Sequence, residues 1–161
     1  MSRVQLALNV DNLDESIAFY SKLFRVEPAK RRPGYANFAV ADPALKLVLI
    51  ENPGQGGSLN HLGVEVSDTG TVDAEQTRLA AAGLASIDER GTTCCYAKQD
   101  KFWVEGAPNG ERWEVYTVLA DSATFTTVTA DEPDAATCCG SDLAAEPAES
   151  ACCAPQQEVP A

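Results

Sequence analysis

The chain has 161 residues, which is enough for one domain with a hydrophobic core. Its 45% hydrophobic and 22% charged residues are typical of a globular protein. The sequence has no run of about 18 apolar residues, so neither a transmembrane helix nor a membrane partner is predicted. The net charge of −12, with clustered bases only at Lys30, Arg31 and Arg32, argues against nucleic-acid binding. Because the first residues run straight into a strand pattern without a leader, we expect a cytoplasmic protein.

The predicted elements begin with a strand over residues 4–10, in which apolar side chains occupy every second position. An amphipathic helix is predicted over residues 13–24, with apolar residues at helical spacing. A short strand around residues 26–30 is a further candidate, and two more strands are predicted over residues 35–40 and 45–51. The glycine-rich stretch at 52–59 is predicted to be a linker.

The alternating pattern of the first strand then starts again. Residues 4–11 align without a gap to residues 60–67, an offset of 56 residues. A second helix is predicted to end at Gly83, and strand-like segments follow at 85–90, 94–99, 101–105 and 112–118. Each half therefore has the order strand, helix and about three strands, which indicates an internal repeat.

A single repeat could not cover its own sheet, so repeats of about 3–51 and 60–118 should pack into one pseudo-symmetric α+β domain, residues 1–118. Beyond it, residues 119–161 hold eight acidic residues, no Lys or Arg, and one aromatic residue, Phe125. Too little apolar surface is available there to offset the entropy of ordering the chain. We therefore predict a disordered, acidic, cysteine-containing tail.

All six cysteines occur as adjacent pairs, which are Cys94–Cys95, Cys138–Cys139 and Cys152–Cys153. Neighbouring cysteines are poor disulfide partners because closing the ring strains the peptide between them, so free dithiols are expected in a reducing compartment. Only Cys94 and Cys95 fall inside the predicted domain. The alternative for these two is a pair of buried strand thiols without a role, and the alternative for the other four is a tail that is merely rich in cysteine.

His61 is the only histidine of the chain, and its repeat partner Gln5 has the same phase on the first strand. Glu114 lies in a late strand between Trp113 and Val115, where a carboxylate needs a partner such as a divalent cation. These three residues therefore form a candidate metal site. The alternatives are a histidine satisfied by its surroundings and a solvated strand around Glu114.

Several other sites are excluded by the same residues. With one histidine, a three-His zinc site and a His-Glu-x-x-His helix cannot form. No nucleophile-elbow sequence accompanies His61, which argues against a Ser-His-Asp triad. The glycines at 54, 56 and 57 precede a strand rather than a helix, so no phosphate-binding loop is predicted.

The doubled unit, the segment Asn60–Val64 and the segment Trp113–Tyr116 together resemble the vicinal oxygen chelate superfamily over residues 3–118. That superfamily includes glyoxalase I, extradiol dioxygenases and bleomycin-resistance proteins. In its metal-dependent members, the first strand of each half and the last strand of a half supply the metal ligands. The resemblance therefore implies a metal held by Gln5, His61 and Glu114.

The segments Gly91–Ala97 and Asp100–Val104 resemble organoarsenical carbon–arsenic lyases and the related cadmium-induced proteins. The resemblance implies that Cys94 and Cys95 bind a trivalent organoarsenical, either methylarsenite or an aromatic arsenical. It also implies that Fe(II) on the neighbouring ligands uses dioxygen to break the carbon–arsenic bond. Adjacent cysteines on a regular strand point to opposite faces, so chelation by both requires a bulge or loop at this pair.

Three functions remain after these steps. The leading hypothesis is an Fe(II)- and dioxygen-dependent lyase that releases arsenite, with formaldehyde as the second product in the methyl case. The alternative is a protein that sequesters arsenic or cadmium without turnover, with accessory sites at Cys138, Cys139, Cys152 and Cys153. A glyoxalase-like isomerase or antibiotic-binding protein is the third, and it leaves the Cys94–Cys95 pair without a role. A monomer and a homodimer are both compatible with the sequence.

Overall fold

The structure, a computed structural model, describes residues 2–125, which form two helices and one eight-stranded sheet. In chain order the elements are β1 (Arg3–Val10), α1 (Leu13–Phe24), β2 (Lys30–Arg32), β3 (Tyr35–Val40), β4 (Leu45–Glu51), β5 (Leu59–Glu65), α2 (Thr69–Ala81), β6 (Ser86–Cys94), β7 (Ala97–Val104) and β8 (Trp113–Asp121). Neither helix in this part of the chain is long and apolar enough to cross a bilayer.

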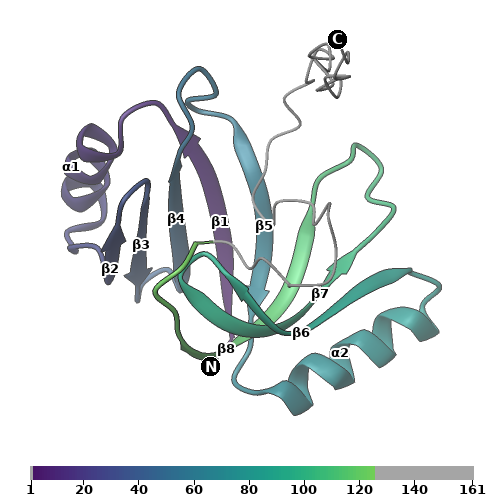
Figure 1. Ribbon diagram of the computed structural model, residues 1–161. Coiled ribbons are helices and arrows are strands. Elements are labelled where there is room, and N and C mark those ends of the chain that lie inside the picture. Colours follow the sequence, from purple (N-terminus) through teal and green to yellow (C-terminus); the bar gives the residue numbers. More distant parts are fainter. Residues whose placement is uncertain (1, 126–161) are drawn as a thin grey trace, which may run out of the picture.

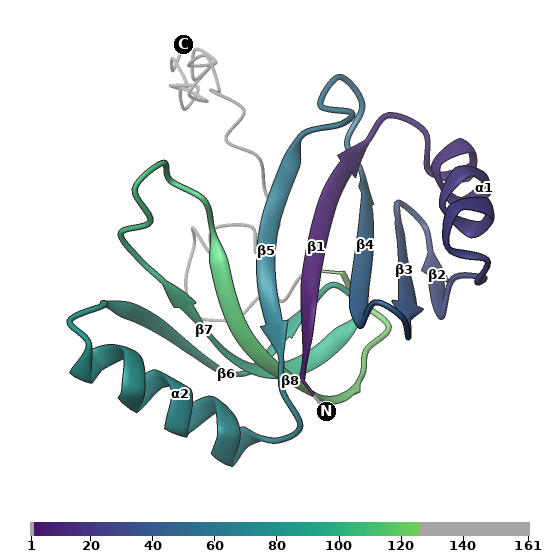
Figure 2. The same cartoon turned by 180° about the vertical axis from the view of Figure 1, so that it is seen from behind.

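The order of strands in the sheet is β2-β3-β4-β1-β5-β8-β7-β6. The first strands of the two halves, β1 and β5, are antiparallel neighbours in its middle. On one side β4 lies parallel to β1, and on the other β8 lies parallel to β5. The second half thus repeats the first, and the predicted α+β fold of two strand–helix–three-strand repeats is confirmed. The strands form one curved sheet, with α1 outside the first half and α2 outside the second (Figures 1 and 2).

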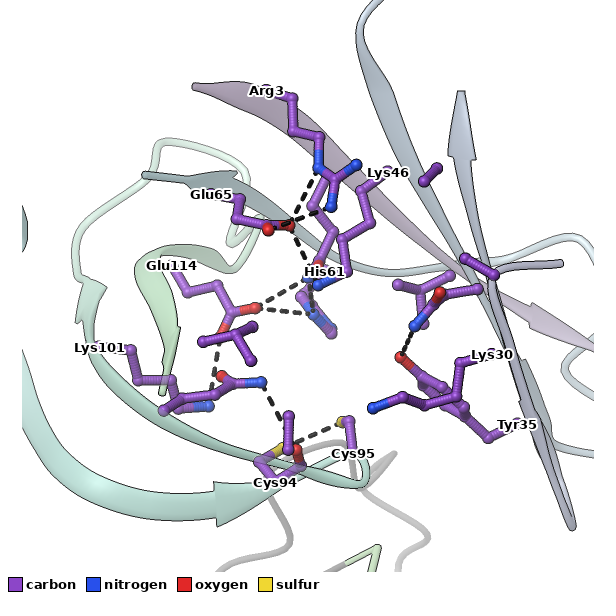
Figure 3. A pocket seen from close by; sticks show the side chains of 18 residues that line it. Arg3, Lys30, Tyr35, Lys46, His61, Glu65, Cys94, Cys95, Lys101 and Glu114 are labelled. Carbon is purple, nitrogen blue, oxygen red and sulfur yellow. Dashed lines mark hydrogen bonds and ion pairs between the residues drawn. The ribbon is translucent and has the colours of Figure 1, made fainter. Parts of the chain in front are cut away.

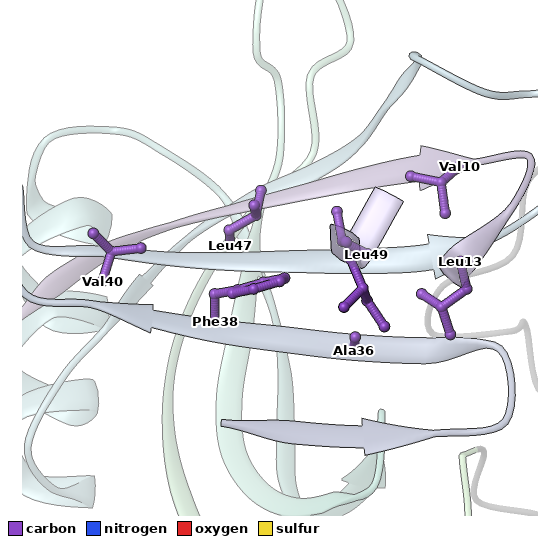
Figure 4. Close-up of a cluster of buried hydrophobic side chains, with 8 residues drawn as sticks. Val10, Leu13, Ala36, Phe38, Val40, Leu47 and Leu49 are labelled. Atoms are coloured by element: carbon purple, nitrogen blue, oxygen red, sulfur yellow. The ribbon is translucent and has the colours of Figure 1, made fainter. Parts of the chain in front are cut away.

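Each helix covers an apolar core on the convex side of its half. The helix α1 starts at Asn12, whose side chain accepts a hydrogen bond from the backbone of Glu15, and it buries Leu13 and Ile17. The first core is formed by Val10, Leu13, Ile17, Ala36, Phe38, Val40, Leu47 and Leu49 (Figure 4). Since these positions alternate along the strands, the residues between them face the concave side.

The second half has a smaller core of the same design. The side chain of Asp68 caps α2 by accepting a hydrogen bond from the backbone of Thr71. Val72 of this helix is fully buried against Val66, Phe102 and Val115. The two helices therefore occupy the outer surface and leave the concave side of the sheet uncovered by a helix.

Two predicted boundaries are wrong. The strand-like segments predicted at 94–99 and 101–105 are replaced by one strand, β7, and a turn separates it from the end of β6. The domain does not end at residue 118, because β8 continues to Asp121 and the next residues pack on the fold as far as Phe125. The sparse apolar pattern after 118 concealed this segment. The rest of the predicted disordered tail, residues 126–161, lies outside the described residues.

Candidate functional site

The concave side of the sheet encloses a cavity of about 200 Å³ (Figure 3). Strands from both halves of the molecule line it. Its buried polar side chains are Gln5, Asn37, Lys46, His61, Gln99, Lys101 and Glu114. Buried polar groups require partners, and so many around one cavity indicate a site that binds a polar ligand or an ion.

Gln5, His61 and Glu114 meet in this cavity. His61 and Glu114 are labelled in Figure 3. The Gln5 Nε2 atom lies 2.9 Å from His61 Nε2 and donates a hydrogen bond to Glu114 Oε1 at 2.8 Å. The His61 Nε2 atom lies 3.4 Å from the same carboxylate oxygen. All three residues are buried. The structure thus brings together the three residues that the sequence suggested, one from each of the adjacent strands β1, β5 and β8.

A glycine makes this meeting sterically feasible. Gly63 of β5 pairs with Gln5 on one side and with Glu114 on the other. A Cβ atom at residue 63 would lie 3.1 Å from Glu114 Cγ and 3.3 Å from Gln5 Cβ. Because no side chain projects from β5 at this position, those of the flanking strands reach each other across it. A glycine inside a strand indicates such close approach, and this signal was present in the sequence.

Lys101 is a site residue that the sequence prediction missed. Its side chain is fully buried, and its Nζ atom lies 3.2 Å from Glu114 Oε2 and 3.4 Å from Glu89 Oε2. The ammonium group also lies 4.5 Å from the centre of the Trp103 ring. Lysine is usually exposed, so alternation along the strand was the only available signal that this one points inward.

The two oxygens of Glu114 therefore have different surroundings. Oε2 faces Lys101, while Oε1 faces Gln5 and His61. Burial alone would raise the pKa of this carboxyl, but the charge of Lys101, together with His61 in its protonated form, outweighs burial and lowers it from the usual 4.5 to about 2. Glu114 is consequently an ionised, buried carboxylate at neutral pH.

Tyr116 fixes the other end of the Gln5 amide. Its hydroxyl, which has one proton, lies 2.5 Å from Gln5 Oε1 and 3.0 Å from Glu65 Oε2. Glu65 is held in turn by ion pairs with Arg3 and Lys46, each at 3.1 Å. If the amide turned over, Tyr116 would accept from Gln5 and donate to Glu65. At this end of the side chain, therefore, either orientation of the amide finds a partner.

These contacts fit a divalent metal ion. Across residues 2–125, no three His, Cys, Asp or Glu side chains are grouped to hold a metal, so a metal site at this point requires the Gln5 amide. Adjacent ligand atoms around an ion with bonds of about 2.1 Å are about 3 Å apart. The three separations among Gln5, His61 and Glu114 range from 2.8 to 3.4 Å. With the amide turned, the Gln5 amide oxygen, the His61 Nε2 atom and a Glu114 carboxylate oxygen would all face one ion.

The thiol pair lies on the wall of the same cavity (Figure 3). Cys94 ends β6, and Cys95 and Tyr96 have φ angles of 54° and 62°. This confirms the expected departure from strand geometry, which brings the two Sγ atoms to 3.0 Å from each other. Neither thiol is in a disulfide. Two sulfurs on one side of a turn are suited to chelating a soft, thiophilic element.

The turn that carries the thiols is held by the segment after β8. The Cys95 backbone N–H donates to the Phe125 carbonyl at 2.7 Å, and the Tyr96 N–H donates to the Thr124 carbonyl at 3.2 Å. The ring of Phe125 packs on Tyr96 and Tyr35 with centroid separations of 5.6 and 6.2 Å. Residues assigned to the tail by the sequence prediction thus support the turn. Cys138, Cys139, Cys152 and Cys153 lie outside the described residues.

Comparisons with known proteins support the fold. A family model described as the glyoxalase/bleomycin resistance protein/dioxygenase superfamily matches residues 3–115. The cadmium-induced protein CadI of Mycobacterium bovis is 72% identical over 125 residues, which cover 78% of this chain and 82% of the relative. A trivalent organoarsenical cleaving enzyme of Thermomonospora curvata is 56% identical over 140 residues, covering 86% of this chain and 89% of that enzyme. The solved structure of the 2,3-dioxygenase LapB from Pseudomonas sp. KL28 has a TM-score of 0.56 at 22% identity, covers 74% of this chain and 42% of its own, and supports the fold alone.

Proposed function

We propose a function from the family of this chain, which belongs to the glyoxalase/bleomycin resistance protein/dioxygenase superfamily and within it to the group of CadI and the trivalent organoarsenical cleaving enzymes. The proposed function is cleavage of the carbon–arsenic bond of trivalent organoarsenicals. The reaction would require Fe(II) and dioxygen. The observation that carries this proposal is that one cavity is lined both by Gln5, His61 and Glu114 and by the thiols of Cys94 and Cys95.

In this proposal Gln5, His61 and Glu114 would hold the iron. An amide, an imidazole and a carboxylate leave coordination positions open, as in other non-haem iron oxygenases, and bound Fe(II) would supply the redox chemistry that makes dioxygen reactive. Lys101 would keep the Glu114 carboxylate ionised and occupy its second oxygen, which leaves Oε1 for the metal. The burial of all three ligands would keep bulk water from the reacting groups.

Cys94 and Cys95 would hold the arsenic. Trivalent arsenic exchanges its hydroxyl groups for thiolates, and two neighbouring sulfurs give a short chelate that one sulfur cannot give. Arsenic bound at this wall would place its organic substituent in the cavity. In the methyl case, one methylarsenite and one dioxygen give one arsenite and one formaldehyde, so the carbon is oxidised to an aldehyde and the arsenic stays trivalent.

The reaction requires reduced thiols, and we propose that the protein works in the cytoplasm, where disulfides are rare. Both thiols of the described chain are free of disulfides, which is consistent with this compartment.

The proposal is tested by supplying the full chain with Fe(II) and methylarsenite in air and measuring arsenite by chromatography with elemental detection. We expect repeated turnover in the wild type and none in Cys94→Ser or Cys95→Ser. The double variant Cys138→Ser/Cys139→Ser is the matched control and should keep turnover. Retention of one unchanged arsenical per chain without arsenite would instead support sequestration, the function that the two thiols could perform without a metal. Full turnover in both single serine variants would contradict a role for the pair.

A further inference from the structure

The nitrogen of His61 that faces away from the cavity contacts Asn60. The two atoms, His61 Nδ1 and Asn60 Oδ1, are 2.7 Å apart. We propose that Asn60 is a positioning residue that holds His61 in the tautomer with the proton on Nδ1, so that Nε2 keeps its lone pair toward the cavity. This inference rests on the metal site of the proposed function, but its central observation concerns the metal-free protein.

Asn60 reaches the ring because β5 contains a bulge. Neighbouring residues on a regular strand point to opposite faces, so an asparagine directly before His61 should point away from it. In the pairing of β5 with β1, however, Ala7 is opposite His61 and Leu8 is opposite Leu59, which leaves Asn60 as an extra residue. Bulges of this kind redirect side chains beside functional sites. Here the bulge brings the Asn60 amide to the same side as the imidazole.

A chain of hydrogen bonds orients the Asn60 amide. Its Nδ2 atom donates to Asn9 Oδ1 at 2.9 Å. The Asn9 Nδ2 atom donates in turn to Ser58 Oγ at 2.9 Å. The Ser58 hydroxyl then donates to the Gln55 backbone carbonyl at 2.7 Å. A backbone carbonyl can only accept, so turning the two amides over would sacrifice the last bond. The Asn60 oxygen is thereby directed at His61.

The contacts on the cavity side of His61 require the same tautomer. Glu114 is paired through Oε2 with Lys101 at 3.2 Å, and its Oε1 atom accepts a hydrogen bond from Gln5 Nε2 at 2.8 Å, so the Gln5 NH₂ group points into the cavity. That NH₂ group has a second proton and lies 2.9 Å from His61 Nε2, which must then act as acceptor. The contacts at both ring nitrogens of His61 therefore place the imidazole proton on Nδ1.

The role of these hydrogen bonds follows from the chemistry of imidazole. In water the form with the proton on Nε2 is the more common neutral tautomer of histidine, and that form cannot bind a metal through Nε2. Partners that fix the ring of a metal-binding histidine typically change metal affinity by about 10–100-fold. His61 and Asn9 are buried, and the bonds that join Asn60 to them are partly buried, so water competes less with these two bonds than it would at the surface. Asn60 would thus prepare the ring before any metal arrives.

The tautomer can be read directly because His61 is the only histidine. Full-length protein without an affinity tag and without metal would be labelled with nitrogen-15 histidine and examined in mildly alkaline buffer by two-bond proton–nitrogen correlation. We expect a protonated Nδ1 and an unprotonated Nε2 in the wild type. Asn60→Leu should shift the ring toward protonation on Nε2, whereas Asn60→Asp should keep the proton on Nδ1, because a carboxylate accepts the same bond.

Metal affinity gives the second measurement. Titration with Co(II), followed by its absorption bands, should show affinity about 10–100-fold weaker in Asn60→Leu and within a few-fold of wild type in Asn60→Asp. A wild-type ring protonated on Nε2, or an Asn60→Leu ring with wild-type tautomer and affinity, would overturn the inference. The wild-type spectrum decides the matter even if a variant fails to fold. No arsenical is used, so failure of carbon–arsenic cleavage would overturn the proposed function and leave this result unaffected.

Discussion

At the scale of single residues, the pair Lys101–Glu114 is the most consequential interaction in the site. Glu114 has its pKa lowered to about 2 from the usual 4.5, so it stabilises the folded state above about pH 4.5 and loses this contribution as the pH falls toward 2. Its Oε2 atom lies 3.2 Å from Lys101 Nζ, and its Oε1 atom lies 2.8 Å from Gln5 Nε2. Removing the ammonium group should leave burial as the dominant influence on the carboxyl.

We therefore expect Lys101→Met to raise the pKa of Glu114 above its usual value. A carboxyl whose pKa is raised in the folded state loses stability as the pH rises, so the metal-free variant should become more stable on acidification from neutral pH toward 4.5. Breaking a buried pair should also cost about 3–5 kcal/mol at neutral pH. Urea unfolding over a pH series would measure both effects.

The double variant Lys101→Met/Glu114→Gln is the control for this experiment. It lacks both charges, so it should recover most of the lost stability. It should show neither the wild-type loss of stability toward pH 2 nor the gain on acidification expected for Lys101→Met. A Lys101→Met variant with the wild-type pH profile would contradict the assignment of Lys101 as the charge that keeps Glu114 ionised.

At the scale of elements, β5 decides how close the candidate metal ligands come. Gly63→Ala would place a methyl group 3.1 Å from Glu114 Cγ and 3.3 Å from both Gln5 Cβ and a ring carbon of Tyr116, which is tighter than ordinary contact. We expect the fold to persist with modest destabilisation of about 1–3 kcal/mol. Because the ligands would be pushed apart, the affinity for Co(II) should fall by at least about 10-fold.

Gly70→Ala is the matched control, because Gly70 is in the first turn of α2, away from the cavity, and its added Cβ would meet only the Asp68 carboxylate, at 3.3 Å. This variant should retain the wild-type affinity for Co(II). Equal affinity in Gly63→Ala and the wild type would contradict the view that Gln5 and Glu114 meet across β5 to form one metal site.

The same elements explain what the sequence could and could not predict. Alternation along β1 and β5 predicted that Gln5 and His61 share a face, because side-chain direction in a regular strand follows from position alone. The bulge at Asn60 breaks that rule, and the gap-free alignment of the two repeats conceals it, since the extra residue appears only in the pairing of β5 with β1. The burial of Lys101 also depends on partners from other strands.

At the scale of the whole molecule, the end of the fold lies further along the chain than its hydrophobic pattern indicated. The turn with Cys95 and Tyr96 depends on backbone hydrogen bonds to the Ser122–Phe125 segment. We therefore expect a chain ending at residue 125 to fold and to bind trivalent arsenicals as the full chain does. A chain ending at residue 118 should lose most of this affinity, because the turn would lose its support.

Isothermal titration of both truncated chains with phenylarsenite, alongside circular dichroism to establish that they fold, would measure this difference. The full chain with its four tail cysteines changed to serine provides the reference for the remaining thiol pair. Equal affinity in the chains ending at 118 and 125 would show that residues 119–125 are dispensable for the thiol turn.

The central claim is that one cavity joins a metal site to a thiol site and uses both to break a carbon–arsenic bond. The most direct measurement is arsenite release from methylarsenite by the Fe(II)-loaded full chain, first without oxygen and then after air is admitted. The account predicts no arsenite in the anaerobic phase, followed in air by release with one dioxygen consumed for each arsenite formed. Equal release of arsenite without oxygen would contradict it.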